Sequence, residues 1–438
     1  MNRKRELRAA LLAAPVLAFF LACSGSGGGK AGDKTEFTFA TWAAGQELQE
    51  FQEIVDRVNE KAQGTRINVL SVPSDYYIKL STLIASRKTP DFFWLTQELI
   101  SRYAQLGAIA DISAPFTAGD ALNPGRYYEG VLASAEYQGR YYGLPWIANP
   151  LIVYLNKNLF DEAGLPCPDP LEGWTWDEFI ETARRLTLVR KDGLGNDYQQ
   201  YGCIVDGWPN IETFIWAGGG DIIADNGVDI TLDSEDSLKG LDILHRILHS
   251  GISPEYSKVS SLGSNNVWFE KQRAAMFMGG IQDNFEKKIA ALPPEERFEI
   301  EYAPMPTGLD GKSWSFDWTA STVLAKNLED SPLAYEILEK LTLEFFQWKI
   351  APPLLGSVEQ ALRIDPLKEK ALPVMELVLR NARSANYVPE WNEINNLLWV
   401  KLYTGMLNDR NFDYRSEAAA IAVKSREFIA KRKGPERQ

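Results

Sequence analysis

Two histidines are the first residues of this sequence that could do chemistry. His245 and His249 stand four positions apart in a stretch with helical periodicity, so both lie on one helix face at a spacing that zinc sites use. A zinc protease would carry glutamate directly after the first histidine, whereas this chain has Arg246 there. The sequence contains no third histidine, so only carboxylates such as Asp242 could complete a site. We therefore predict no metal site.

Nucleophilic catalysis is not indicated either. The sequence has no Gly-x-Ser-x-Gly turn, and a Ser-His-Asp arrangement would have to use one of the same two histidines. Its 59 aspartates and glutamates leave one enzymatic alternative open, because a glycoside hydrolase needs only two carboxyl groups about 5–9.5 Å apart. The sequence does not exclude such a pair, so a glycoside hydrolase remains an alternative.

The N-terminus has the features of an export signal. Four basic residues precede an uncharged, mostly apolar run from Ala9 to Leu21, which is shorter than the ~20 residues of a membrane-spanning helix. Cys23 then resembles the cysteine that bacterial lipoproteins carry after the cleavage point, where it receives the lipid. Phe20 and Leu21 depart from the usual leucine and small residue of that pattern. The alternative is an ordinary secreted protein cut near Ala22.

We accordingly predict a signal peptide over residues 1–22 and a lipid-anchored, flexible tether over 23–34, which is rich in glycine and serine. Removing the signal takes away a net charge of +3, so the formal charge of −13 becomes −16. A surface this negative repels nucleic acid and anionic lipid headgroups. Export would permit a disulfide between Cys167 and Cys203, and two free thiols are the alternative.

The mature body begins with alternating strands and helices. Residue types and periodicity predict strands over 35–42, 66–72 and 91–95, with helices over 46–63 and 76–88 between them. Such alternation implies parallel pairing in a layered α/β structure, and helix predominates beyond residue 150. The sequence Thr175-Trp176-Asp177-Glu178 predicts a capped helix start, which gives Trp176 and its neighbour Trp174 a structural role.

Several ordered blocks resemble a known family. The chain reads PDFFWLTQELISRYAQLGAIADIS from Pro90 and YYGLPWIANPLIVYLNKNLFDEAGLP from Tyr141, followed by the TWDEF segment. These blocks resemble the extracellular sugar-binding proteins of ABC transporters, a family that includes maltose-binding protein. Weaker matches at 218–227, 270–281 and 302–312 continue in the family's order. Residues 313–318 (SWSFDW) depart from it, because many members have a glycine-rich strand entry there.

The resemblance implies an α/β fold of two lobes, each a mostly parallel sheet flanked by helices, with the ligand in the cleft between them. By correspondence, the N-terminal lobe comprises 35–147 plus 318–350, and the C-terminal lobe comprises 148–317 plus 351–438. The implied function is to capture a sugar or oligosaccharide and deliver it to the transmembrane subunits of an ABC permease. The resemblance thus implies a protein that is not an enzyme, with no catalytic residues and no cofactor, and an exported glycoside hydrolase is the alternative. The resemblance and the N-terminal signal together imply a monomer held by its lipid on the cell membrane, facing the periplasm or the exterior.

A sugar site needs aromatic rings for the apolar sugar faces and planar polar groups for the hydroxyls. The chain has 13 tryptophans, and Trp42 ends the first predicted strand, where ligands of α/β sheets gather, with Gln46 and Glu47 close behind. Positions in the family blocks and near the glycine motifs add Gln97, Glu98, Asn149, Trp208, Asn210, Gly279, Gln282 and Asp283. Asp317, Trp318, Trp391 and Trp399 complete the candidate set. We assign Trp348 to the core. At each of these positions the alternative role is core packing, helix capping or surface solvation. For the whole protein, a third functional class is an adhesion protein that binds no small ligand.

Overall fold

The computed structural model describes residues 34–62, 64–117, 119, 121–349 and 352–433. The signal peptide, Cys23 and all of the predicted tether except Lys34 lie outside the described residues. Within the described part, no helix is both long enough and apolar enough to cross a membrane.

The first lobe begins as the sequence predicts. Strands β1 (Thr35–Thr41), β2 (Thr65–Ser71) and β3 (Phe92–Thr96) are parallel, with β1 in the middle. Helices α1 (Gly45–Lys61) and α2 (Tyr76–Ala85) connect them, and α3 (Gln97–Gln105) follows β3 directly. These elements confirm the predicted order of strands and helices.

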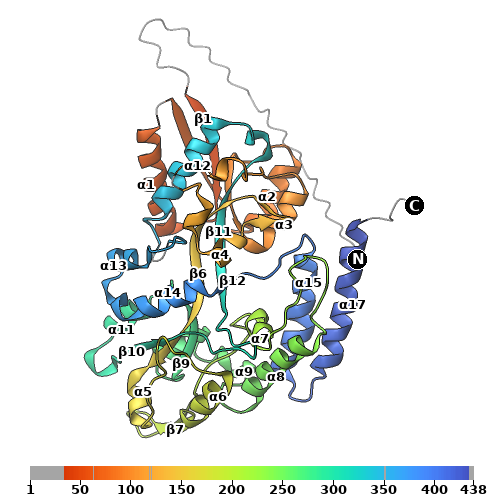
Figure 1. Ribbon diagram of the computed structural model, residues 1–438. Coiled ribbons are helices and arrows are strands. Elements are labelled where there is room, and N and C mark those ends of the chain that lie inside the picture. Colours follow the sequence, from red (N-terminus) through yellow and green to blue (C-terminus); the bar gives the residue numbers. More distant parts are fainter. Residues whose placement is uncertain (1–33, 63, 118, 120, 350–351, 434–438) are drawn as a thin grey trace, which may run out of the picture.

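Two long strands run through both lobes and join them. Strands β6 (Leu144–Asn156) and β11 (Ser315–Leu324) pair with each other in an eight-stranded sheet of order β10-β6-β11-β3-β1-β2. Figure 1 shows both passing from the upper lobe, which contains β1, to the lower lobe. In the lower lobe β6 pairs with β9 (Met276–Gly280) and β10 (Ile300–Ala303).

The prediction of mostly parallel sheets is wrong for the second lobe. Both β9 and β10 pair antiparallel with β6, and in the first lobe β3 pairs antiparallel with β11. The reason is topological. Strand β6 enters the second lobe antiparallel to β9 and β10, and β11 enters the first lobe antiparallel to β3. The overall class is nevertheless the two-lobed α/β fold that was expected.

The remaining elements are mostly helices of the second lobe (Figure 1). Four short strands form two hairpins, β4 (Glu136–Tyr137) with β5 (Arg140–Tyr141) and β7 (Leu188–Lys191) with β8 (Asp197–Gln200). The other helices and the last strand are α4 (Glu129–Ala133), α5 (Lys157–Glu162), α6 (Trp176–Arg185), α7 (Ile211–Ala217), α8 (Glu235–His249), α9 (Tyr256–Val259), α10 (Asn265–Glu270), α11 (Phe285–Ala290), α12 (Pro332–Phe345), α13 (Ala361–Ile364), α14 (Leu372–Arg380), β12 (Ala382–Arg383), α15 (Trp391–Leu397), α16 (Thr404–Asn408) and α17 (Tyr414–Lys433).

Helix α6 shows why the local sequence folds as it does. The Thr175 hydroxyl accepts a hydrogen bond from the Glu178 N–H, and the Glu178 carboxylate accepts one from the Thr175 N–H. This is the predicted capping box, which satisfies two backbone donors that the first helical turn leaves free. Trp174 and Trp176 are buried beside Phe179, as their structural assignment requires.

Each lobe has its own hydrophobic core. The first-lobe core gathers around Phe39, Phe51 and Trp94, and Trp348 packs against it with its ring stacked 5.6 Å from Trp146. Trp318, on β11, packs against this core and also against the main core of the second lobe, so it lies at the junction. Helix α4 also contacts both sides, because its Leu132 belongs to the first-lobe core and its Val131 packs with second-lobe residues.

Candidate functional site

Strand register brings several predicted residues to one edge of the sheet. Thr96, the last residue of β3, pairs with Ala320 of β11, and Trp318 of β11 pairs with Asn149 of β6. Trp318 and Asn149 are therefore neighbours on adjacent strands, and Glu98 lies in the first turn of α3, two residues after the end of β3. This edge is where β6 and β11 leave the first lobe, so the residues collect at the junction of the two lobes.

Trp42 belongs to an aromatic cluster of the first lobe. It follows β1 and is half-buried, with ring centroids 5.4 Å from Tyr76, 6.4 Å from Tyr77 and 5.0 Å from Trp94. The two tyrosines begin α2, and the prediction missed them because a helix start gives no sign of which strand end it faces. This cluster holds the Trp42 indole in place, which is what a stacking platform requires.

The polar residues after Trp42 already form a hydrogen bond and an ion pair within the first lobe. The exposed Gln46 amide donates to Glu50 at 2.9 Å, and Glu47 pairs with Lys349 at 2.8 Å. Both are partly or fully exposed at the start of α1, so a ligand could reach them only by competing with these bonds.

Gln97 and Glu98 have different surroundings. Gln97 is buried, and its amide donates to the Asp317 carbonyl at 2.7 Å and accepts from the Thr319 hydroxyl at 2.8 Å. It therefore ties α3 to the crossing strand and presents no free group. Glu98 is half-buried and accepts a hydrogen bond from Thr96 at 2.7 Å, while burial raises the pKa of its carboxyl.

A second polar group forms where β6 enters the second lobe. The Asn149 amide oxygen accepts the Gln282 N–H at 2.9 Å, and the Gln282 side chain donates to the Ala148 carbonyl at 2.9 Å. The Gly280 N–H donates to Asp283, whose carboxyl pKa is raised by burial. A Cβ on Gly280 would lie 2.2 Å from the Asn149 amide oxygen, so only glycine allows this approach. Gly279, Gln282 and Asp283 are thus gathered around Asn149.

The second lobe offers a small pocket of about 190 Å³ between α7 and the helices after Trp391. Asn210, Glu212 and Asn395 supply its polar groups, and Trp399 and Tyr403 supply its rings. Trp399 is 42% exposed, and it packs so closely on Gly207 that a Cβ there would come within 2.3 Å of the ring. Predicted Asn210 and Trp399 thus share one pocket with Glu212, which the prediction missed because nothing in the sequence distinguishes it from surface glutamates.

Other candidate residues lie deeper. Trp391 is 3% exposed, with its ring 4.8 Å from Tyr387, so it presents no stacking face in this conformation. The Trp208 indole is half-buried and donates to the Met278 carbonyl at 2.7 Å, which fixes it beside the end of β9. Asp317 is fully buried, and one of its carboxyl oxygens accepts the Asn149 N–H at 2.7 Å.

The charges of three carboxyl groups affect Tyr387. The pKa of the Tyr387 hydroxyl is raised by burial and then by the charges of Glu212, Glu98 and Asp317. Burial raises the pKa of Glu212 to about 7, and the charges of Asp221 and Glu98 add to the effect. Burial also raises the pKa of Asp317 well above its usual range.

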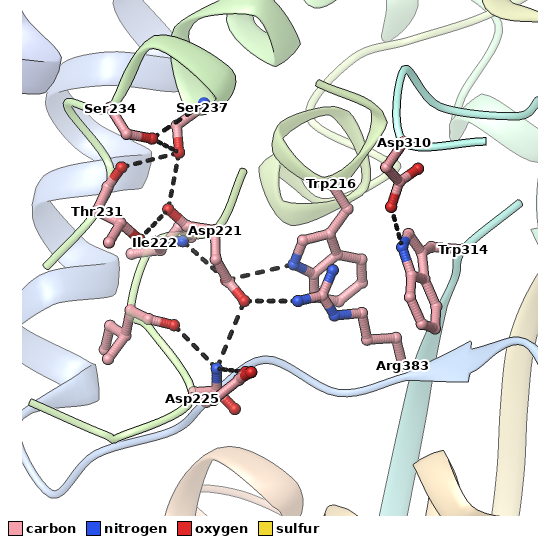
Figure 2. Close-up of polar contacts among 12 residues, drawn as sticks. Trp216, Asp221, Ile222, Asp225, Thr231, Ser234, Ser237, Asp310, Trp314 and Arg383 are labelled. Atoms are coloured by element: carbon pink, nitrogen blue, oxygen red, sulfur yellow. Dashed lines mark hydrogen bonds and ion pairs between the residues drawn. The ribbon is translucent and has the colours of Figure 1, made fainter. Parts of the chain in front are cut away.

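An arginine ties β12 to α7 and to the segment before β11 (Figure 2). Arg383, on β12, pairs with Asp221 at 2.7 Å, and its guanidinium lies 4.7 Å from the Trp216 ring and 4.9 Å from the Trp314 ring. The Trp314 indole also donates to Asp310 at 2.9 Å. The segment that departs from the family pattern, residues 313–318, thus supplies one face of this arginine sandwich.

The two histidines hydrogen-bond to the backbone, and the two described cysteines are unpaired. Each histidine ring bonds a backbone carbonyl at 2.9 Å, His245 that of Arg410 and His249 that of Met406. Among the described residues, no three side chains of the metal-binding types come together. Cys167 and Cys203 are both free thiols, so the described chain has no disulfide between them.

Comparison with known proteins defines the class. Residues 43–344 match the family model for bacterial extracellular solute-binding proteins, and the chain belongs to this family. A Brucella abortus binding protein is 24% identical over 355 residues, which cover 78% of this chain and 81% of that protein. The maltotriose-binding protein of Pyrococcus abyssi is 23% identical over 273 residues, or 60% of this chain and 54% of that protein.

A solved structure shows the same fold. The ABC substrate-binding protein of Listeria monocytogenes in complex with cycloalternan matches with a TM-score of 0.70 and 20% identity. The match covers 92% of this chain and 100% of that chain.

Proposed function

We propose that this protein captures a sugar or oligosaccharide between its lobes and delivers it to the transmembrane subunits of an ABC importer. The observation that carries the proposal is the strand register that sets Trp318 beside Asn149 on the two strands joining the lobes of a solute-binding fold. We add Trp42 of the first-lobe aromatic cluster and Trp399 of the second-lobe pocket to the proposed site. Rings can stack on the apolar faces of a pyranose, while amides and carboxyls bond its hydroxyls. The names of the Pyrococcus and Listeria proteins support a sugar ligand.

Binding does no chemistry in this proposal. A ligand that contacts both lobes interacts better with the closed arrangement than with the open one, and only that difference can shift the equilibrium toward closure. The closed shape is then what a permease recognises. The lobes would span 35–147 plus 318–350 and 148–317 plus 351–438, with the boundary at 350–351 outside the described residues.

The decisive experiment is thermal unfolding against a panel of mono- and oligosaccharides, followed by recovery of each ligand. A ligand that binds only the folded protein adds about 2.7 kcal/mol of stability at 100 times its dissociation constant. We expect at least one oligosaccharide to stabilise the protein and to be recovered intact. Cleavage of the bound sugar would instead support the glycoside hydrolase, and no stabilisation by any sugar would contradict the proposal.

We also propose that the mature chain is a monomer anchored through lipid on Cys23. The Cys23→Ser variant should lose lipid labelling and move to the soluble fraction. Equal membrane retention of the wild type and the variant would reject the anchor.

A further inference from the structure

Thr96 occupies a helix-capping position without capping the helix. It is the N-cap residue of α3, where a threonine hydroxyl usually accepts a hydrogen bond from a backbone N–H of the first turn. No such side-chain bond forms here, although a capping bond stabilises a helix by about 1 kcal/mol. Instead the buried Thr96 hydroxyl donates to the Glu98 carboxylate at 2.7 Å and lies 2.9 Å from the Tyr77 hydroxyl. The hydroxyl therefore holds a side chain in place of the backbone.

A threonine hydroxyl carries one hydrogen, and this fixes the direction of the two bonds. An ionised carboxylate can only accept, so Thr96 gives its hydrogen to Glu98. The hydrogen of the other bond must then come from Tyr77. The result is an ordered series in which Tyr77 donates to Thr96 and Thr96 donates to Glu98. We call these three residues the hydrogen-bond chain.

Tyr77 also connects the hydrogen-bond chain to the aromatic cluster around Trp42. Its ring lies 6.4 Å from the Trp42 ring at an interplanar angle of 62°. The neighbouring Tyr76 fixes the start of α2, because its hydroxyl accepts the Trp94 N–H at 3.2 Å. One set of contacts within the first lobe thus holds both the Trp42 indole and the Glu98 carboxylate, and both side chains are only half-buried.

The Glu98 carboxylate keeps bonding capacity for a ligand. A carboxylate offers about four acceptor positions, and among the described residues Thr96 is the one side chain that hydrogen-bonds to it. Burial raises the pKa of Glu98, whereas the Thr96 bond lowers it, so the hydrogen-bond chain favours the ionised form. An ionised carboxylate of this kind can accept a hydrogen from a sugar hydroxyl.

We propose that Tyr77 and Thr96 are positioning residues, which hold the Glu98 carboxylate at a fixed place relative to the Trp42 ring so that it accepts a hydrogen from a hydroxyl of the bound sugar. This inference rests on the proposed function, because it needs a sugar in the site. Neither Tyr77 nor Thr96 has to touch that sugar. A carboxylate that is already oriented loses less freedom on binding, so removing the Thr96 hydroxyl weakens affinity.

Near-isosteric variants test the inference by calorimetry on the mature chain. The probe is the sugar that binds wild type most tightly in a panel that includes maltotriose, mannotriose and arabinotriose. Thr96→Val removes the hydroxyl and should weaken binding of the probe by about tenfold, whereas Thr96→Ser keeps the hydroxyl and should stay within about threefold of wild type. Tyr77→Phe should weaken binding by about threefold, because Thr96 can still donate. Tyr103→Phe is the matched control and should bind as wild type does, since its hydroxyl bonds Ser81 at 3.1 Å.

A double-mutant cycle with Glu98→Ala separates positioning from folding. Once the carboxylate is removed, Thr96→Val should have no further effect on affinity, because the group that it orients is gone. Urea unfolding of the same variants measures stability separately. If Thr96→Val does not fold, Tyr77→Phe takes its place in the cycle.

The outcomes separate the two proposals. If Glu98→Ala binds the probe as wild type does, or if Thr96→Val weakens binding equally with and without Glu98, the inference is wrong and the sugar-binding function stands. A Thr96→Val variant that loses stability but keeps its affinity also overturns the inference. If no sugar of the panel binds wild type, the proposed function fails together with the inference.

Discussion

Replacing Glu212 with glutamine should stabilise the ligand-free protein at neutral and higher pH. The carboxyl is 4% exposed and bonds no other described residue, so its charge is unfavourable in the folded state. Burial, Asp221 and Glu98 together raise its pKa from 4.5 to about 7. At about 1.4 kcal/mol for each pKa unit, this rise corresponds to about 3 kcal/mol of folding free energy.

The sign of the pH dependence follows from proton binding. Between pH 4.5 and about 7 the folded protein holds a proton on Glu212 that the unfolded chain releases. The contribution of this group to stability is therefore intact below pH 4.5 and is lost as the pH rises through about 7. Glutamine carries no such proton, so the variant does not suffer this loss.

Urea unfolding of ligand-free protein at pH 4.5, 6 and 8 measures the effect. The free energies of unfolding of wild type and Glu212→Gln should be similar at pH 4.5, and the variant should be more stable by about 3 kcal/mol at pH 8. Glu427→Gln, an exposed control, should show no difference that depends on pH. A variant that is less stable than wild type at pH 8, or a difference that is the same at all three pH values, would refute the reasoning.

Three further changes test other parts of the site and its support. Gly280→Ala should displace the Asn149 amide, because the added Cβ would lie 2.2 Å from the amide oxygen. We expect a loss of about 1–3 kcal/mol in the free energy of unfolding by urea, together with weaker ligand binding. Unchanged ligand affinity would exclude Asn149 from the site. Lys368→Met should lower the free energy of unfolding by about 3–5 kcal/mol, because it leaves the Glu286 carboxylate buried without the ammonium 3.0 Å away. Adding Glu286→Gln should restore part of that stability, which it would not do if the loss were purely steric. Trp42→Ala should weaken ligand binding by about 1–3 kcal/mol in calorimetry with the fold retained by circular dichroism, and a folded variant that binds as wild type does would exclude Trp42 from the site.

The sequence predicts local structure here better than it predicts the site. Residue periodicity located β1, α1, β2, α2 and β3, and a four-residue pattern located the capped start of α6. Local patterns could not show that β6 and β11 cross between lobes, because periodicity records which residues are buried and not which lobe buries them. The antiparallel pairs of the second lobe follow from this crossing.

Sequence reasoning likewise selected some candidate site residues for sound reasons, selected others that the fold buries, and missed one. Trp42 was selected because it ends a strand, and Asn149 because it falls at the crossover within a family block. Asn149 lies beside Trp318 on the crossing strands, and Trp42 lies in the first-lobe aromatic cluster. Gln97 was selected for its type, although burial and bonds to β11 occupy its amide. Trp391 was selected as an aromatic residue, although its ring is buried against Tyr387. Glu212 was missed, since its significance depends on its burial and on its place in the second-lobe pocket, which only the folded chain reveals.

Small-angle scattering of the mature chain with and without its sugar ligand tests the central claim most directly. Because the ligand is proposed to contact Trp42 and Glu98 on one lobe and Trp399 on the other, binding should reduce the radius of gyration. The same sample should return the ligand chemically unchanged. Saturating binding with no decrease in the radius of gyration, or a ligand recovered as hydrolysis products, would contradict the account.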